Sequence, residues 1–143
     1  MTDPHELDRF VEAQDRHGTY GQALAELRRG RKTSHWMWFV FPQIEGLGSS
    51  PTARRYAITG LEEARAYLRH PVLGPRLREC AEVLAGLQAG TAEEILGSVD
   101  AMKLRSSLTL FAAADPDDDL FARVLTRYFA VPDPASTARL GAR

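Results

Sequence analysis

The sequence predicts an all-α, single-domain protein of about eight short-to-medium helices. Apolar residues recur at the i, i+3, i+4 spacing of an amphipathic helix in nearly every segment. Only residues 35–41 also fit a strand, and the chain offers no second strand to pair with it. With 143 residues, 44% hydrophobic and 26% charged, the chain has the size and composition of one soluble globular domain.

The first two helices are expected between residues 4 and 30. Asp3 followed by proline is a typical helix start, and the apolar positions that follow continue in line with Gln14. This amide is either a polar group at the core edge or a ligand contact. Gly18 breaks the first helix and Gly30 ends the second as a C-cap, so the pair is expected to pack antiparallel.

Residues 33–51, TSHWMWFVFPQIEGLGSSP, are the stretch around which the rest of the chain is organised. It gathers His35, Trp36 and Trp38 into a run that is apolar all round. We expect a short helix over 35–41, ended by the proline that follows, and an alternating strand is the competing interpretation. The basic residues just before it are typical of a solvated helix end, or of a positive rim beside the aromatic run.

A loop of small residues follows and leads into a Ser-Pro helix start. Its glycines and capping serine, with the arginines of the next helix, are Gly46, Gly48, Ser50, Arg54 and Arg55. A Gly/Ser loop before a helix N-terminus could hold an anion such as a phosphate. A plain tight turn is the alternative, because GLGSSP lacks the third glycine and preceding strand of a dinucleotide fingerprint and the lysine of a P-loop.

Further helices are expected over 61–70, 73–90, 92–97 and 98–113, and after an acidic loop. We expect the folded domain to span residues 3–130. Residues 131–143, rich in Pro and Ala, are expected to form an extended or partly disordered tail.

Polar residues interrupt the apolar surface of the helix over 98–113. Asp100, Lys103 and Ser107 fall on one stripe, with apolar residues on both sides. Polar groups inside an apolar arc are costly to bury unless they are paired. Asp100 and Lys103 therefore form either an i, i+3 pair at the core edge or part of a functional site.

Composition narrows the classes of function. A formal net charge of −1 gives no global field for nucleic acid or an anionic membrane. The single cysteine, Cys80, excludes an internal disulfide and fits a cytoplasmic protein, with the thiol buried and structural. No metal site and no cofactor are expected, because the histidines lack ligand spacing. A Ser–His–acid set from Ser106 or Ser107 with His35 and Asp100 lacks a nucleophile elbow.

The remaining hypothesis is a pocket for a small anionic or nucleotide-like molecule, such as ADP-ribose, enclosed by the aromatic run. In a catalytic version Asp100 is the general acid or base, His35 its partner, and Lys103 holds an anionic group. The ligand-binding candidates are Trp36, Trp38, Gln43, Gly46, Gly48, Ser50, Arg55, Ser106 and Ser107. One alternative is a non-catalytic interaction module in which Trp36 and Trp38 anchor a partner protein. Another is that both tryptophans belong to the core.

The string SHWMWFVFPQ, together with Gly46-Leu47-Gly48, His70-Pro71 and Lys103–Ser107, resembles the bacterial and fungal family catalogued as domain of unknown function 1810. The resemblance runs from about Phe10 to Thr137. This family, sometimes mislabelled calpastatin, implies a small all-helical single domain and names no substrate. A looser analogy is to the helical NADAR enzymes, which act on ADP-ribose linkages, but their W-P-T-x-E-H-Y type signature is absent here.

Overall fold

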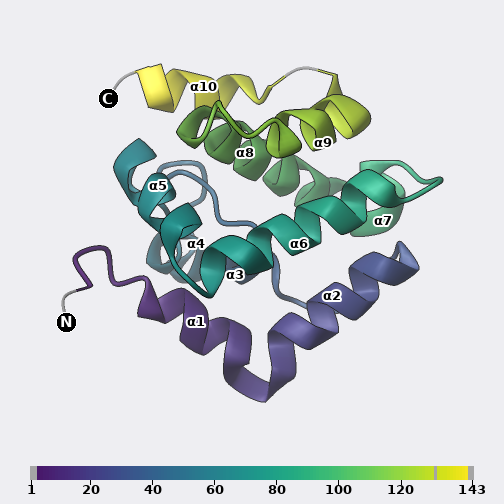
Figure 1. Cartoon of the computed structure of the whole chain (residues 1–143), viewed down its shortest axis with the longest axis horizontal. Helices are drawn as coiled ribbons and strands as arrows, with labels where there is room; N and C mark the ends of the chain where they lie inside the picture. Colours follow the sequence, from purple (N-terminus) through teal and green to yellow (C-terminus); the bar gives the residue numbers. More distant parts are fainter. Residues whose placement is uncertain (1–2, 131, 142–143) are drawn as a thin grey trace.

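The chain folds into helices joined by short loops, and the computed structural model describes residues 3–130 and 132–141 (Figure 1). The only strand-like pairing in these ranges is an isolated bridge between Ile44 and Ile58. The predicted all-α single domain is therefore confirmed. The helices are α1 Asp8–Asp15, α2 Thr19–Arg29, α3 Met37–Val40, α4 Pro51–Arg55, α5 Leu61–Arg69, α6 Leu73–Gly86, α7 Ala92–Leu96, α8 Ser98–Ala114, α9 Leu120–Phe129 and α10 Pro134–Gly141, with a 3-10 turn, η1, over Arg16–Gly18.

The first two helices diverge from η1 as the arms of a V (Figure 1), so the expectation of antiparallel packing is wrong. His17 and Gly18, both with positive φ, make the bend. Helix α1 begins later than the Asp3-Pro4 signal suggests. The carboxylate of Asp3 nevertheless accepts the backbone N–H groups of Leu7 and Asp8 at 2.8 and 3.0 Å, so it acts as a cap at the true helix start.

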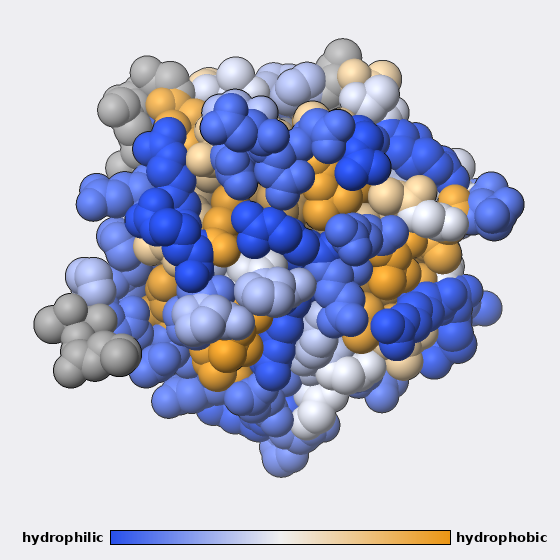
Figure 2. Space-filling view, viewed as in Figure 1, coloured by the Kyte–Doolittle hydropathy of each residue, from blue (hydrophilic) through white to orange (hydrophobic). Residues whose placement is uncertain are grey.

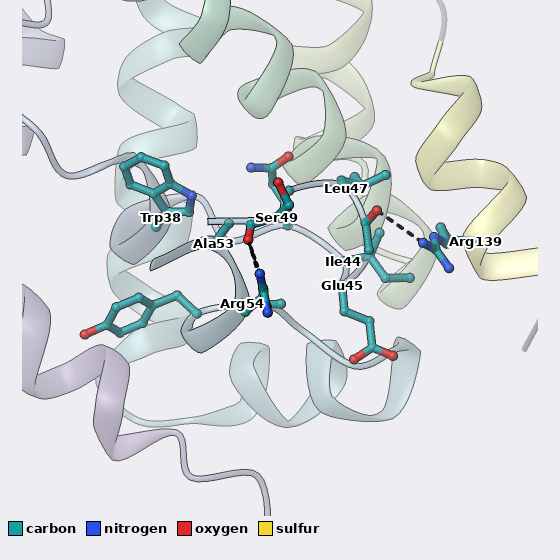
Figure 3. A pocket seen from close by; sticks show the side chains of 13 residues that line it. Trp38, Ile44, Glu45, Leu47, Ser49, Ala53, Arg54 and Arg139 are labelled. Carbon is teal, nitrogen blue, oxygen red and sulfur yellow. Dashed lines mark hydrogen bonds between the residues drawn. The ribbon is translucent and has the colours of Figure 1, made fainter. Parts of the chain in front are cut away.

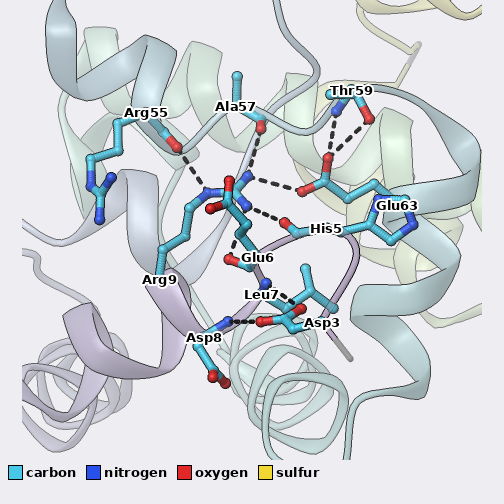
Figure 4. A network of polar contacts seen from close by, with 10 residues as sticks. All are labelled: Asp3, His5, Glu6, Leu7, Asp8, Arg9, Arg55, Ala57, Thr59 and Glu63. Atoms are coloured by element: carbon cyan, nitrogen blue, oxygen red, sulfur yellow. Dashed lines mark hydrogen bonds and ion pairs between the residues drawn. The ribbon is translucent and has the colours of Figure 1, made fainter. Parts of the chain in front are cut away.

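Arg9 ties the N-terminal segment to the loop between α4 and α5 (Figure 4). Its guanidinium donates to the carbonyls of Arg55 and Ala57 at 2.8 and 2.9 Å and to a carboxylate oxygen of Glu63 at 2.9 Å. The other oxygen of that carboxylate accepts the backbone N–H and the hydroxyl of Thr59. This saturated cluster fixes the end of α4, which borders the site described below.

Helix α8 lies at the centre of the core. It packs against α5, α7, α9 and α10, and more lightly against α3. Leu104, Leu108 and Phe111 are buried on one side, and Leu110 is buried on the other. Because most of α8 is buried, its polar residues contact water only where the neighbouring segments leave an opening. Asp100 and Lys103 lie at such an opening.

The central segment is shaped by a buried carboxylate that the sequence pattern did not reveal. Helix α3 is a single turn, shorter than the expected 35–41 helix, and the strand alternative is excluded. Ser34 does not cap it. Instead Glu26 of α2, fully buried, accepts the backbone N–H groups of Thr33 and Ser34, the Ser34 hydroxyl and the Trp36 indole N–H at 2.6–3.0 Å. These bonds hold residues 33–36 in a non-helical path.

The C-terminal segment corrects a further expectation. Residues 134–141 form α10, which lies along α8 (Figure 1), whereas an extended tail was expected; Val131, Ala142 and Arg143 lie outside the described residues. Asp133 makes the difference. Its Oδ2 accepts the N–H and hydroxyl of Ser136 and the hydroxyl of Ser106, and its backbone N–H donates to Thr109. Asp133 therefore both caps α10 and holds it against α8.

Candidate functional site

Three adjoining cavities surround one side chain, Trp38, and together we name them the Trp38 cleft. The first, about 500 Å³, lies between the 43–49 loop, α4 and Arg139 of α10 (Figure 3). The second, about 460 Å³, lies between the same loop, α8 and the start of α10. The third, about 350 Å³, lies between residues 32–38 and the first turn of α8. Segments far apart in sequence therefore form one surface depression.

The two tryptophans have different positions. Trp36 has 0% of its surface exposed, and its indole N–H donates to Glu26 at 2.9 Å. Trp38 is partly exposed and borders all three cavities. The ammonium of Lys103 lies 3.7 Å from the centroid of its ring, a cation–π contact. Trp36 is thus a buried core residue that borders only the third cavity, whereas Trp38 is the tryptophan with exposed surface in the cleft.

Asp100 is held between two lysines. Its carboxylate accepts Lys32 Nζ at 2.7 Å and Lys103 Nζ at 3.2 Å. Burial raises the pKa of Asp100, but the hydrogen bonds and charges of the two lysines outweigh burial and leave that pKa below its ordinary value. The expected i, i+3 pair therefore forms, with Lys32 as an additional partner. Lys32 belongs to the basic run that was expected either at a solvated helix end or as a positive rim beside the aromatic run, and its side chain is only 7% exposed.

His35 and Asp100 line the same cavity, the third, but in different settings. His35 is exposed at its rim, whereas Asp100 is partly buried. A general base works best with a pKa near the working pH, and the pKa of Asp100 is shifted the other way. The arrangement is suited to holding two ammonium groups in place rather than to moving a proton through Asp100.

The glycine loop is a place of close approach. A Cβ on Gly46, whose φ is +92°, would lie 2.0 Å from the guanidinium of Arg139, and a Cβ on Gly48 would lie 2.7 Å from Ala53. Arg139 donates to the carbonyl of Gly46 at 3.1 Å, and Arg54 donates twice to that of Ser49 (Figure 3). Two arginines thus fix the loop through its carbonyl oxygens.

Of the remaining candidates in this region, Gln43 and Ser50 line the cleft and Arg55 does not. Gln43 borders the first and second cavities, and Ser50 borders the second while its hydroxyl caps α4 by accepting the N–H of Ala53 at 3.1 Å. Arg55 does not line the cleft. It borders a separate cavity beside Arg9, and the neighbouring Arg54 is the arginine of α4 that lines the cleft.

The two adjacent serines of α8, Ser106 and Ser107, lie in different environments. Ser106 lines the second cavity and donates to Asp133 at 3.2 Å. Ser107 is fully buried, lines none of the three cavities, and its hydroxyl has no hydrogen-bond partner among the described residues. Of the stripe formed by Asp100, Lys103 and Ser107, only the first two residues therefore line the cleft.

Lys32, Arg139 and Asp133 were not among the candidates. Arg139 reaches the cleft from a position with no local signal, whereas Lys32 belongs to the basic run for which a positive rim beside the aromatic segment was one interpretation. Asp133 had a local signal, because Asp133-Pro134 is the same cap-plus-proline start that was used at Asp3 and Ser50. Among the described residues no group of three or more His, Cys, Asp or Glu side chains is placed to bind a metal. Burial raises the pKa of the Cys80 thiol to about 12, in keeping with a structural cysteine.

The fold and the cleft define a class: small all-α proteins in which a central aromatic segment, the helix α8 and a docked C-terminal helix enclose a surface cleft. The chain belongs to the family described as Protein of unknown function (DUF1810), whose profile matches residues 4–140. It is similar to the conserved hypothetical protein Rv1873 from Mycobacterium tuberculosis, with 50% identity and a TM-score of 0.93 over 97% of this chain and 99% of that one.

A comparison with curated proteins finds no match. The surface seen in Figure 2 is mostly hydrophilic, with apolar residues in separate patches. No helix in the described ranges has the length and hydropathy needed to cross a bilayer.

Proposed function

We propose that this protein binds a small molecule with a flat ring and an anionic group, of the kind found in nucleotides and ADP-ribose. The observation that carries the proposal is the position of Trp38, whose partly exposed indole borders all three cavities. Tyr56 adds a second aromatic side chain to the first cavity. Aromatic faces are surfaces on which flat heterocycles stack, and small-molecule sites combine such walls with a few polar groups.

The polar groups around the ring position are suited to a heterocycle. The amide of Gln43 borders the first and second cavities, and an amide both donates and accepts, as the edge of a nucleobase requires. The loop carrying Gly48 and Ser49 forms the opposite wall, fixed by Arg54 and Arg139. A wall fixed before the ligand arrives reduces the entropy cost of binding.

The proposal is for binding, without an acid–base role for Asp100. A carboxylate whose pKa lies below its ordinary range is a weak base at neutral pH, and it does not carry a proton to donate. His35, exposed at the rim, is the remaining titratable group of the earlier catalytic hypothesis that is free to act on a ligand there.

A second candidate function is supported by the surface of α8. Val99 and Met102, one helical turn apart, are 66% and 69% exposed and border the second cavity. Exposed apolar side chains beside a cleft are a feature of protein-interaction surfaces. In this version Trp38 is the only tryptophan available as an anchor, because Trp36 is buried.

Trp36 and Trp38 are the only tryptophans in the chain, so fluorescence can test the proposal directly. Trp36→Phe leaves Trp38 as the reporter, and Trp38→Phe leaves Trp36 as a matched control. Titration with adenosine, AMP, NAD and ADP-ribose should change the emission of the first variant more than that of the second, because Trp36 is buried and borders only the third cavity. A ligand that affects both variants equally, or neither, contradicts the proposal.

Thermal denaturation of the unlabelled protein gives an independent measurement. A ligand at 100 times its dissociation constant adds about 2.7 kcal/mol, and with about 2.1 cal/mol/K of unfolding entropy per residue this raises the Tm by about 9 °C. Trp38→Ala should abolish the shift, whereas Arg123→Met, on the exposed surface of α9, should retain it. Loss of the shift in Met102→Glu, with Trp38→Ala unaffected, would favour the surface of α8 over the cleft.

A further inference from the structure

We propose that the third cavity of the Trp38 cleft is a phosphate subsite, in which Lys32 and Lys103 bind the anionic group of the ligand. This inference deepens the proposed function and rests on it for the rest of the ligand. Sixteen of the eighteen basic residues in the chain are arginines, and these two are its only lysines. They lie 71 positions apart in sequence, yet both ammonium groups contact the carboxylate of Asp100.

The choice of lysine has a chemical meaning. Arginine offers a flat fork for bidentate pairing, whereas lysine is a compact point charge with three donors. An ammonium that gives one donor to Asp100 retains others for a second acceptor. In a chain that uses arginine everywhere else, two ammonium groups on one carboxylate form a small cluster with donors still to be satisfied.

The charges within this cluster do not balance. Two ammonium groups and one carboxylate give an excess of one positive charge, and the side chains of Lys32, Lys103 and Asp100 are only 7%, 19% and 18% exposed. Sheltering a charge from water is costly unless it is paired. A bound anion would restore the balance and accept the remaining N–H donors.

The other acidic groups nearby are engaged elsewhere. Within the described residues, Asp100 is the only carboxylate within 4 Å of either lysine. Glu26, behind Trp36, receives five hydrogen bonds from neutral donors. Asp133 borders the second cavity and receives hydroxyl and N–H groups of Ser106 and Ser136.

The walls of the third cavity add to the attraction for an anion. Its floor includes the first turn of α8, from Gly97 to Val99, and the Gly97 cap has no side chain to occupy the first N–H groups of this 17-residue helix. Those groups lie at the positive end of the helix dipole. His35, exposed at the rim, adds a side chain that can donate a hydrogen bond to an anion.

The geometry joins this subsite to the position proposed for the ring. Lys103 borders both the second and the third cavity, and its ammonium lies on the ring of Trp38. A ligand with its phosphate between the lysines would therefore have its ring on the Trp38 side of Lys103. The ligand class is a nucleoside phosphate or a similar ring-bearing phosphate ester.

Two lysines in one chain make the test direct. Protein labelled with 13C only in lysine gives ε-methylene NMR signals from Lys32 and Lys103 alone. Addition of inorganic phosphate should shift both signals with saturation, at constant ionic strength set by sodium chloride. Lys32→Met and Lys103→Met should each weaken phosphate binding at least tenfold, and Arg123→Met on the exposed surface of α9 should leave it unchanged.

The contrary results are equally specific. Shifts that rise linearly without saturation, or that acetate reproduces at the same concentration, overturn the phosphate subsite. Equal affinities for AMP and adenosine, with both lost in Trp38→Ala, also overturn it while leaving the ring-binding proposal intact. Phosphate binding that depends on both lysines, with no gain in affinity from AMP over phosphate, supports the subsite and contradicts the ring-binding proposal.

Discussion

Replacement of Glu26 by glutamine should destabilise the protein by an amount that can be worked out from its hydrogen bonds. One carboxylate oxygen of Glu26 accepts three N–H groups, from Thr33, Ser34 and Trp36, at 2.7–3.0 Å. The other accepts the hydroxyl of Ser34 and the amide of Gln22. A glutamine oxygen can still receive the three N–H groups. The NH2 group of the glutamine, however, would face the Ser34 hydroxyl and the Gln22 amide, which donate to Glu26 in the wild type and would have to reorient.

The magnitude follows from the change of charge. A hydrogen bond to a charged acceptor contributes about 1 kcal/mol more than one to a neutral acceptor. Three such bonds, less the lower cost of burying a neutral group, give a loss of about 2–3 kcal/mol. With about 0.3 kcal/mol/K of unfolding entropy for a chain of this length, the Tm should fall by about 7–10 °C.

The loss should also depend on pH. Burial raises the pKa of Glu26, but its hydrogen bonds with residues 33–36 outweigh burial and hold the pKa far below its ordinary range. A depressed folded-state pKa stabilises the protein above the unfolded value of about 4.3, and that stabilisation is lost as the pH falls below it. The difference between wild type and Glu26→Gln should therefore be constant above about pH 5 and shrink in acid.

Thermal and urea denaturation, followed by circular dichroism between pH 3 and 7, measure the fall in Tm and its dependence on pH. Glu12→Gln, on the exposed surface of α1, is the matched control and should unfold like the wild type. A Tm of Glu26→Gln within 1 °C of the wild type, or a stability difference that stays constant down to pH 3, would refute the reasoning.

Three further changes test the parts that surround the cleft. Asp100→Asn should cost about 2 kcal/mol in urea denaturation, because two sheltered lysines lose their carboxylate, and a loss below 0.5 kcal/mol would contradict this. Asp133→Ala should accelerate amide hydrogen exchange in α10 and leave the centre of α8 protected; equal rates in the two proteins would argue against docking through Asp133. Cys80, with its pKa raised to about 12 by burial, should react with a thiol reagent at pH 8 only after unfolding, and rapid labelling of the folded protein would contradict that assignment.

Local signals predicted most of the fold. Gly30 ends α2 with φ of +74°, Ser50 caps α4, and Thr91 forms the complete capping box of α7. Each of these features depends on residues within four positions of one another, so the sequence carries them in readable form. The prediction of an extended or partly disordered tail was wrong because it relied on the Pro and Ala content and overlooked the Asp133-Pro134 helix start. Ser106, which donates to Asp133, lies 27 positions away in sequence.

The site was less predictable because its contacts are distant in sequence. Trp38 and Lys103 were chosen from an aromatic run and a polar stripe, and the structure brings them together. Nothing local distinguishes Trp36 from Trp38, since the buried Glu26 that decides between them lies on another helix. Lys32 likewise follows the arginines near the end of α2, and no local pattern shows that it reaches Asp100, 68 positions further on.

Three partly or fully buried carboxylates hold the walls of the Trp38 cleft. Glu26 fixes residues 33–36, Asp100 fixes both lysines, and Asp133 fixes the start of α10 on α8. The hydrophobic core cluster of the described residues, by contrast, contains no carboxylate or histidine. The pKa values of Glu26 and Asp100 are both lowered, so these two supports persist at neutral pH and fail only in acid. Acid should therefore loosen the cleft before it melts α8, and ligand affinity should fall at a higher pH than helix content does. A cleft held in place by ionised side chains is organised before any ligand arrives, which would lower the entropy cost of the binding that we propose.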